Sequence, residues 1–147
     1  MAKNDHSYDI LKLDNQVCFP LYACSKELVR QYTPYLKELN LTYTQYIAMM
    51  VLWEQERCSV KELGQKLYLD SGTLTPVLKS LEQKGFIRRF RSESDERVLL
   101  VELTKDGEKL KKSAEGIPQS VGACIGLSPE EAIQLYTLLY KVLGNVT

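Results

Sequence analysis

The sequence predicts a mainly α-helical fold that carries one small β-hairpin, and three observations support this fold class. Helix-capping signatures recur along the chain, with apolar residues at helical spacing after each of them. Two runs rich in apolar residues, FIRRFR and RVLLVELT, flank the polar turn SESDE and predict two strands. The length of 147 residues, 44% of them hydrophobic, suits one domain with a sizeable core.

The first expected helix covers about residues 14–32 and ends before Pro34. Its apolar stripe is formed by Val17, Leu21, Leu28 and Val29. Pro20 is unusual in this range, because an interior proline loses a backbone hydrogen bond and clashes with the carbonyl group four residues before it. We therefore expect either a kink beside Cys18 or a regular helix that begins later than residue 15.

Two capping boxes, Thr42 with Gln45 and Ser59 with Glu62, are each expected to begin a helix. The first of these helices runs to about residue 56 and the second to about residue 67. The buried side of the first is expected to use Tyr46, Ile47, Met50 and either Trp53 or Val51.

A longer helix follows, capped by Asp70 or Ser71 and running through Lys84, with Gly85 as the left-handed residue that ends it. The residues spaced to face the core are Leu74, Leu78 and Leu81. The predicted hairpin comes directly after this helix. Two helices, a longer helix and a hairpin together make the order of a winged helix-turn-helix.

Two helices are expected after the hairpin. Thr104 caps the segment KDGEKLKKSAEGI, whose outer face carries mostly Lys and Glu. Ser128, Pro129 and Glu131 stand in the order of cap, first helical residue and capping-box acid, and this last helix runs to about Leu143. Its broad apolar face consists of Ala132, Leu135, Tyr136, Leu139, Val142 and Leu143. Such a face favours packing, and we expect it to contact another subunit.

The charges are distributed unevenly, although 19 basic and 19 acidic residues give no net charge. The segment from Arg57 to Arg91 holds eight basic and three acidic residues, an excess of five positive charges. By charge alone this segment is either a solvated face or a nucleic-acid-binding surface. Its coincidence with the predicted helix-turn-helix favours nucleic acid.

The second helix of a helix-turn-helix enters the major groove with its N-terminal residues. The hydroxyl groups of Ser71, Thr73 and Thr75 are placed there to approach base edges or phosphates, and Lys79 follows one turn later to contact phosphate. Ser71 has a second interpretation as a plain helix cap, and one residue can serve both purposes.

The hairpin offers one further DNA contact. Arg97 is the residue expected to enter the minor groove, where a narrow A·T tract concentrates negative potential. Asp95 is expected to fix the orientation of Arg97. Since a lone arginine in a hairpin is usually just solvated, this prediction depends on the helix-turn-helix beside it.

The chemistry-bearing residues exclude several classes of protein. The four cysteines, Cys18, Cys24, Cys58 and Cys124, form no C-x-x-C pair, and the single histidine is His6, so we expect no metal site and no cofactor. No apolar stretch approaches the ~18 residues of a membrane span, and MAKNDHSYDI lacks the pattern of a signal peptide. We therefore expect a cytoplasmic protein with no membrane partner, in which the cysteines are reactive or buried thiols.

The segment LYLDSGTLTPVLKSLEQKGFIRR, followed by SDER and LTKDG, strongly resembles the MarR family of winged-helix repressors. The segments QVCFPLYACSKELVRQYTPYL and LNLTYTQYIAMMVLWE narrow the resemblance to the OhrR branch, which consists of thiol-based sensors of organic hydroperoxides. The resemblance implies a single domain over residues 1–147 and an intertwined α-helical homodimer. About residues 13–40 and 105–147 would serve dimerisation, and about 42–103 would bind a pseudo-palindromic operator in double-stranded DNA.

The resemblance also implies roles for individual residues. It identifies Cys18, in the context Q-x-C-F, as the sensing cysteine, with Tyr32 and Tyr43 hydrogen-bonding its sulfur across the dimer. It assigns DNA binding to the same positions named above: Ser71, Thr73, Thr75, Lys79, Asp95 and Arg97. The chain departs from the family at Pro20, where an aliphatic residue is expected.

The implied chemistry is reasonable for the residues around Cys18. A thiolate near the start of a helix is stabilised by the helix dipole and by tyrosine hydroxyl donors, and its attack on a peroxide gives a sulfenic acid. The apolar neighbours Phe19, Leu21 and Tyr22 favour an organic hydroperoxide as the oxidant. Without the resemblance, a cysteine on an apolar helix is more often a small buried hydrophobe.

The fate of the sulfenic acid has two interpretations within the family. Cys124 lies just before the last helix, about where a resolving cysteine is expected, so we expect an intersubunit disulfide between Cys18 and Cys124. In the alternative, a small thiol forms a mixed disulfide with Cys18.

These inferences predict a transcriptional repressor that binds its operator when reduced and releases it when an organic hydroperoxide oxidises Cys18. One alternative is a MarR-type regulator that responds to another oxidant or to a small ligand. A second is a thiol peroxidase, but an enzyme would have no use for the basic helix and wing. A third is a winged-helix interaction module, which predicts no salt-dependent DNA binding.

Overall fold

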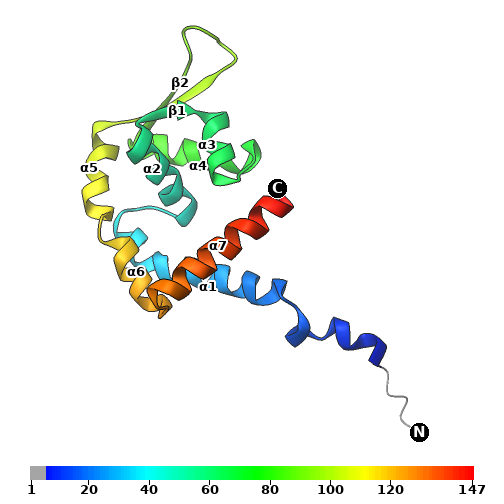
Figure 1. Ribbon diagram of the computed structural model, residues 1–147. Coiled ribbons are helices and arrows are strands. Elements are labelled where there is room, and N and C mark those ends of the chain that lie inside the picture. The colour runs from blue at the N-terminus through cyan, green and yellow to red at the C-terminus, as the bar shows by residue number, and fades with distance from the viewer. Residues whose placement is uncertain (1–5) are drawn as a thin grey trace. The chain divides into compact units, whose positions relative to one another are not determined.

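The structure is a computed structural model that describes residues 6–147 (Figure 1). Residues 1–5 of the segment tested above for a signal peptide lie outside the described residues. The chain divides into two compact units, the first ending at Glu115 and the second comprising Gly116–Thr147. Between residues 6 and 147, no helix is both long and apolar enough to cross a membrane.

The first unit contains the predicted winged helix-turn-helix. Its elements are α1 (Cys18–Glu38), α2 (Tyr43–Gln55), β1 (Arg57–Ser59), α3 (Val60–Leu67), α4 (Ser71–Gln83), β2 (Ile87–Arg91), β3 (Leu99–Leu103) and α5 (Lys105–Ala114). The strands form an antiparallel sheet in the order β1-β3-β2. Val101 of the central strand β3 lies opposite Cys58 of β1 on one side and opposite Arg89 of β2 on the other. The predicted fold class is confirmed, but β1 was missed, because three residues are too few to show strand alternation.

Helix α1 differs from its prediction at both ends. It begins at Cys18, so Pro20 stands in the first turn, where a backbone N–H has no partner within the helix. A later start was one of the two expected consequences of this proline. Residues before it form two 3₁₀ helices, η1 (His6–Leu11) and η2 (Leu13–Asn15).

The predicted end of α1 before Pro34 is wrong, because the helix continues through this proline to Glu38. Leu36, two residues later, is 2% exposed and belongs to the core. The hydroxyl of Thr33 donates to the Val29 carbonyl at 3.4 Å. The packing of the last turn thus outweighs the one backbone hydrogen bond that Pro34 lacks.

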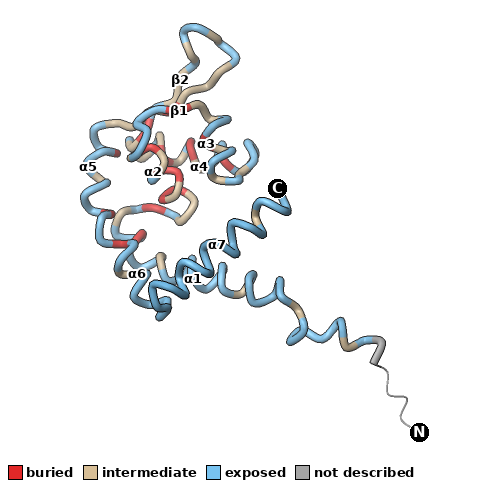
Figure 2. The backbone as a smooth tube through the Cα atoms, viewed as in Figure 1, coloured by how far each residue is buried: buried red, intermediate tan, exposed pale blue. Residues whose placement is uncertain are grey.

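The core lies between α2, α3, α4 and the sheet (Figure 2). The predicted leucines of α4 are all buried, together with Leu63 of α3, Ile87 of β2 and Val101 of β3. On α2 the buried residues are Gln45, Tyr46, Ala48, Met49 and Leu52. The prediction of Met50 is wrong, because its side chain is exposed. An unbroken apolar run from Tyr46 to Trp53 gives the sequence no contrast from which to choose a face.

The chain after the hairpin folds into three helices where two were expected. Helix α5 ends at Ala114, short of the predicted end at residue 117, and a separate helix α6 (Ile117–Ile125) follows with Pro118 in its first turn. Helix α7 (Pro129–Val146) begins with the predicted capping box and extends three residues past Leu143. None of its residues is buried within the subunit, as the pale blue tube of α7 in Figure 2 shows.

Candidate nucleic-acid interface and redox site

Helix α3 and the turn that joins it to α4 are held by local contacts. The capping box of α3 is complete. The Glu62 carboxylate accepts from the Ser59 backbone N–H at 2.8 Å, and the Glu62 backbone N–H donates to the Ser59 hydroxyl at 3.1 Å. Gly64 permits the close approach of the turn, because a Cβ atom there would lie 2.8 Å from the Leu69 carbonyl oxygen. Helix α3 ends at Tyr68, its C-cap, which has a left-handed φ of 54°.

Asp70 is the cap of α4, and its carboxylate accepts from the Thr73 backbone N–H at 2.8 Å. The two hydrogen bonds from Thr73 hold the pKa of the Asp70 carboxyl below its usual value. Ser71 is therefore the first helical residue and is not needed as the cap. Its exposed side chain lies at the N-terminus of α4, which is the end that a helix-turn-helix places in the major groove.

Helix α4 separates a buried face from a polar one. Its three buried leucines fix the helix to the core, while Ser71, Thr73, Thr75 and Lys79 are all exposed. The Thr75 hydroxyl donates to the Ser71 carbonyl at 2.7 Å, which leaves its oxygen lone pairs to accept a hydrogen bond. The four predicted DNA-contacting residues of α4 thus lie on its exposed face, away from the core.

The wing carries Arg97 and Asp95 in contact with each other. The Arg97 guanidinium donates to the two carboxylate oxygens of Asp95 at 3.1 and 3.2 Å, and the Arg97 backbone N–H donates at 3.0 Å. These hydrogen bonds lower the pKa of the Asp95 carboxyl. The Arg97 side chain is 91% exposed, so Asp95 orients it without burying it.

A cavity of about 660 Å³ is lined by residues of both α4 and the wing. Its lining includes Ser71 at the start of α4, Arg97 and Val98 of the wing, and Tyr68 and Lys61 of α3 and the turn. One predicted major-groove residue, Ser71, and the predicted minor-groove residue, Arg97, thus border one groove of the first unit.

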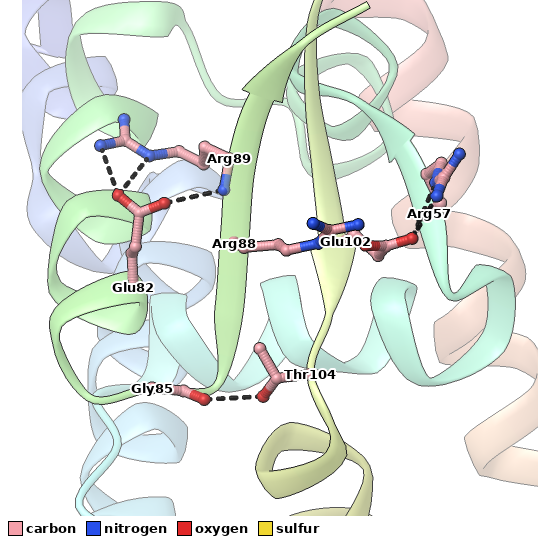
Figure 3. A network of polar contacts seen from close by, with 7 residues as sticks. All are labelled: Arg57, Glu82, Gly85, Arg88, Arg89, Glu102 and Thr104. Carbon is pink, nitrogen blue, oxygen red and sulfur yellow. Dashed lines mark hydrogen bonds and ion pairs between the residues drawn. The ribbon is translucent and has the colours of Figure 1, made fainter.

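Ion pairs at the root of the wing neutralise part of the basic segment (Figure 3). Arg89 pairs with Glu82 of α4 at 3.1 Å, and Arg57 and Arg88 both pair with Glu102 on β3. Three of the eight basic residues counted in the sequence are therefore already paired within the protein. Sequence reasoning missed these pairs, because their members are brought together only by the sheet and the turn before it.

An aromatic cluster joins α1 to α2. The rings of Tyr32 and Tyr43, the two predicted partners of the sensing sulfur, lie 5.0 Å apart, and Tyr46 lies 5.7 Å from Tyr32. Burial, and then the neighbouring Tyr32, raise the pKa of Tyr43 and of Tyr46. Both phenols therefore keep their protons and remain able to donate a hydrogen bond. The predicted burial of Tyr46 is confirmed, but its contact with Tyr32 and Tyr43 was not predicted.

Cys18 and the tyrosines do not meet within one subunit. Cys18 is the first residue of α1 and is exposed, while Tyr32 follows it by 14 residues on the same helix. At 1.5 Å per residue that separation is about 21 Å along the helix axis. A contact between the Cys18 sulfur and these hydroxyls therefore requires a second copy of the chain.

The other cysteines differ in burial. Cys124 lies in the last turn of α6, where its thiol contacts the Ser120 carbonyl at 3.5 Å, and it is exposed, as is Cys24. Cys58 is buried on β1, and burial raises the pKa of its thiol. In the described part of the chain, no group of three or more His, Cys, Asp or Glu side chains is arranged to hold a metal ion.

Known proteins share both sequence and structure with this chain. The family model described as transcriptional regulator SarA/Rot matches residues 30–114. The organic hydroperoxide resistance transcriptional regulator of Bacillus subtilis is 50% identical over 142 residues, which are 97% of each chain. Reduced AbfR bound to DNA is similar in structure, with a TM-score of 0.77 and 33% identity over 95% of this chain and 98% of that one. A disulfide-formed structure of AbfR matches with a TM-score of 0.64, 33% identity, and coverage of 93% and 96%.

Proposed function

Because the chain belongs to the MarR family of winged-helix transcriptional regulators, in its OhrR branch, we propose that it is a peroxide-sensing repressor. The reduced homodimer binds a pseudo-palindromic operator, and oxidation of Cys18 by an organic hydroperoxide releases the DNA. The observation that carries this proposal is the presence in one chain of an exposed cysteine at the start of α1 and a groove bordered by Ser71 and Arg97. The relatives named above are regulators, which weighs against the thiol peroxidase considered from the sequence.

The chemistry begins at the Cys18 sulfur. The first residue of a helix lies at the positive end of the helix dipole, which stabilises a thiolate. The thiolate attacks the outer oxygen of the hydroperoxide, the O–O bond breaks, and protonation of the departing alkoxide gives an alcohol. Cysteine is oxidised to sulfenic acid and the peroxide is reduced. Phe19, Leu21 and Tyr22 expose apolar surface beside the sulfur, which suits an alkyl group.

The dimer is supported by surface that a single subunit leaves uncovered. Helix α7 exposes a series of large apolar residues: Ile133, Leu135, Tyr136, Leu138, Leu139, Tyr140, Val142 and Val146. Helix α1 likewise exposes Phe19, Leu21, Tyr22, Leu28 and Val29. Apolar surface of this extent on a soluble protein marks an interaction site. A second copy would cover it and would also supply Tyr32 and Tyr43 to the Cys18 sulfur.

Each subunit of the dimer would then contact one half-site. The N-terminal turn of α4 enters the major groove, where Ser71, Thr73 and Thr75 approach base edges or phosphates and Lys79 contacts phosphate. Arg97, oriented by Asp95, enters the adjacent minor groove.

Cys124 is the proposed resolving residue. Its thiol attacks the sulfenic sulfur of Cys18 in the other subunit, forming the S–S bond and releasing water. A solved structure of the similar protein AbfR is of its disulfide-formed state, which supports a disulfide step in this chain. We expect that bringing the two sulfurs to within ~2.05 Å moves a helix and so changes the direction of the wings. A non-reducing gel of the oxidised Cys124→Ser protein tests this step, and a disulfide-linked dimer band that persists would remove Cys124 from the mechanism.

The proposal is tested by fluorescence anisotropy on DNA from the promoter of the chain's own gene. We expect the reduced protein to bind this DNA, and one equivalent of cumene hydroperoxide to release wild type but not Cys18→Ser. Cys24→Ser is the matched control, because this exposed thiol lies on the same helix and the variant should respond like wild type. If wild type and Cys18→Ser both stay bound after oxidation, the regulator answers another signal and the redox proposal is wrong.

A further inference from the structure

One ion pair ties the wing, which is the β2–β3 hairpin, to helix α4 (Figure 3). Glu82, in the last turn of α4, accepts hydrogen bonds from the Arg89 guanidinium at 3.1 and 3.3 Å and from the Arg89 backbone N–H at 2.7 Å. The Arg89 side chain is largely buried, with 18% exposure. One carboxylate therefore holds both the backbone and the side chain of the same strand residue.

The place of Arg89 in the sheet makes this contact specific. Strand β2 lies at an edge of the sheet, since the strand order is β1-β3-β2. Backbone N–H groups of an edge strand point alternately toward the neighbouring strand and away from it. The N–H of Arg89 points away from β3, and Glu82 supplies its acceptor. The hairpin, whose root is already held by strand pairing and by the buried Ile87, is thus also fastened to α4 along its free edge.

We propose that Glu82 and Arg89 are positioning residues for DNA recognition, which fix the angle between α4 and the wing so that Arg97 reaches the minor groove while α4 occupies the major groove. This inference rests on the proposed function. The hairpin tip lies about five residues beyond Arg89, or ~16 Å at ~3.3 Å per residue. A rotation of about 10° at Arg89 would move the tip by roughly 3 Å, as much as a full hydrogen-bond length.

The same sheet provides a matched control. Glu102 also forms ion pairs, but with Arg57 and Arg88 of the neighbouring strands rather than with α4. Glu82→Gln and Glu102→Gln each remove one negative charge from the DNA-binding unit. Because DNA is a polyanion, electrostatics alone predicts that either change strengthens binding. The positioning role predicts the opposite sign for Glu82→Gln.

The experiment measures the affinity of the reduced protein for its promoter DNA by fluorescence anisotropy. Glu82→Gln is expected to weaken binding about tenfold, a loss similar to that of Arg97→Ala. Arg89→Lys keeps the charge but loses the two guanidinium N–H groups that both donate to one Glu82 oxygen, so it should also weaken binding. In an Arg97→Ala background, neither substitution should weaken binding further, because the wing no longer has a contact to misplace. Glu102→Gln should not weaken binding in either background.

Two results would overturn the proposal: an affinity for Glu82→Gln that is unchanged or higher, or a loss of the same size when Arg97 is already alanine. If Glu82→Gln does not fold, as judged by thermal unfolding, Arg89→Lys and its double variant with Arg97→Ala decide the question alone. Different results would contradict the proposed function and the positioning role of Glu82 and Arg89. Reduced wild type that does not bind DNA contradicts the proposed function, whereas normal wild-type behaviour with Glu82→Gln equal to Glu102→Gln contradicts only the positioning role.

Discussion

Replacing Gly107 by alanine should destabilise the first unit, because helix α5 approaches the root of the wing too closely for a side chain. A Cβ atom at Gly107 would lie 2.2 Å from the Phe86 carbonyl oxygen and 2.8 Å from the Leu103 side chain. Neither backbone can withdraw freely. The Phe86 oxygen accepts from the Thr104 N–H at 3.1 Å, and the Gly107 oxygen accepts from the Trp53 indole at 2.8 Å.

The magnitude follows from two opposing effects. Inserting a methyl group into a packed site costs up to about 3 kcal/mol, and this contact with a backbone oxygen belongs at the upper end. Because alanine has a higher helix propensity than glycine, the same substitution also stabilises the helix by about 1 kcal/mol. We therefore expect a net loss of about 2 kcal/mol in the free energy of unfolding. For a chain of this size that corresponds to a Tm lower by about 4–8 °C.

The assay is thermal unfolding followed by circular dichroism, with every variant at the same protein concentration because a dimer's Tm depends on it. Gly64→Ala is the comparison, since it gains the same helix propensity but its Cβ would lie 2.8 Å from the Leu69 oxygen. The loss should be smaller at Gly64 than at Gly107. A neutral or stabilising effect of Gly107→Ala, or a larger loss at Gly64 than at Gly107, would show that these close contacts do not limit stability.

Three further predictions concern the same unit. Gln45→Met should lower the free energy of unfolding in urea by about 2 kcal/mol, because the buried amide accepts from the Lys84 ammonium and donates to the Ser80 hydroxyl; equal stability would contradict this. The Arg89 backbone N–H and guanidinium hold the pKa of Glu82 below its usual value, so its contribution is complete above the unfolded pKa of ~4.3 and is lost as pH falls through the folded one. Urea unfolding between pH 3 and 7 should show a smaller acid loss for Glu82→Gln than for wild type, and parallel curves would count against the assignment. In a variant with its other three cysteines changed to serine, Cys58 should react with a thiol reagent only after unfolding, and rapid reaction of the native protein would show that it is accessible.

The sequence predicted best those features that local chemistry decides. The capping boxes at Thr42, Ser59 and Ser128 mark real helix starts, because the cap and its partner lie only three residues apart. The left-handed Gly85 after α4 was predicted for the same reason. The strands of the hairpin were evident because both are longer than the three-residue β1.

The sequence predicted poorly those features that depend on tertiary contacts. Pro34 signals a helix end, but Leu36 is buried beyond it and the helix continues. The exposed position of Met50 was hidden by the apolar residues on either side of it. In the candidate site, Asp95 and Arg97 were paired correctly at a spacing of two. The pair of Glu82 and Arg89 was not, because seven residues and a change from helix to strand separate them.

Whether oxidation of Cys18 controls DNA binding is tested by following DNA release and Cys18 oxidation in one titration. Reduced protein on its promoter DNA is titrated with cumene hydroperoxide, anisotropy gives the bound fraction, and intact-mass and peptide analysis give the oxidised fraction of each cysteine. We expect DNA release to rise in proportion to Cys18 oxidation, and the Cys18→Ser protein to stay bound throughout. Full oxidation of Cys18 with the DNA still bound, or release before Cys18 is modified, would contradict it.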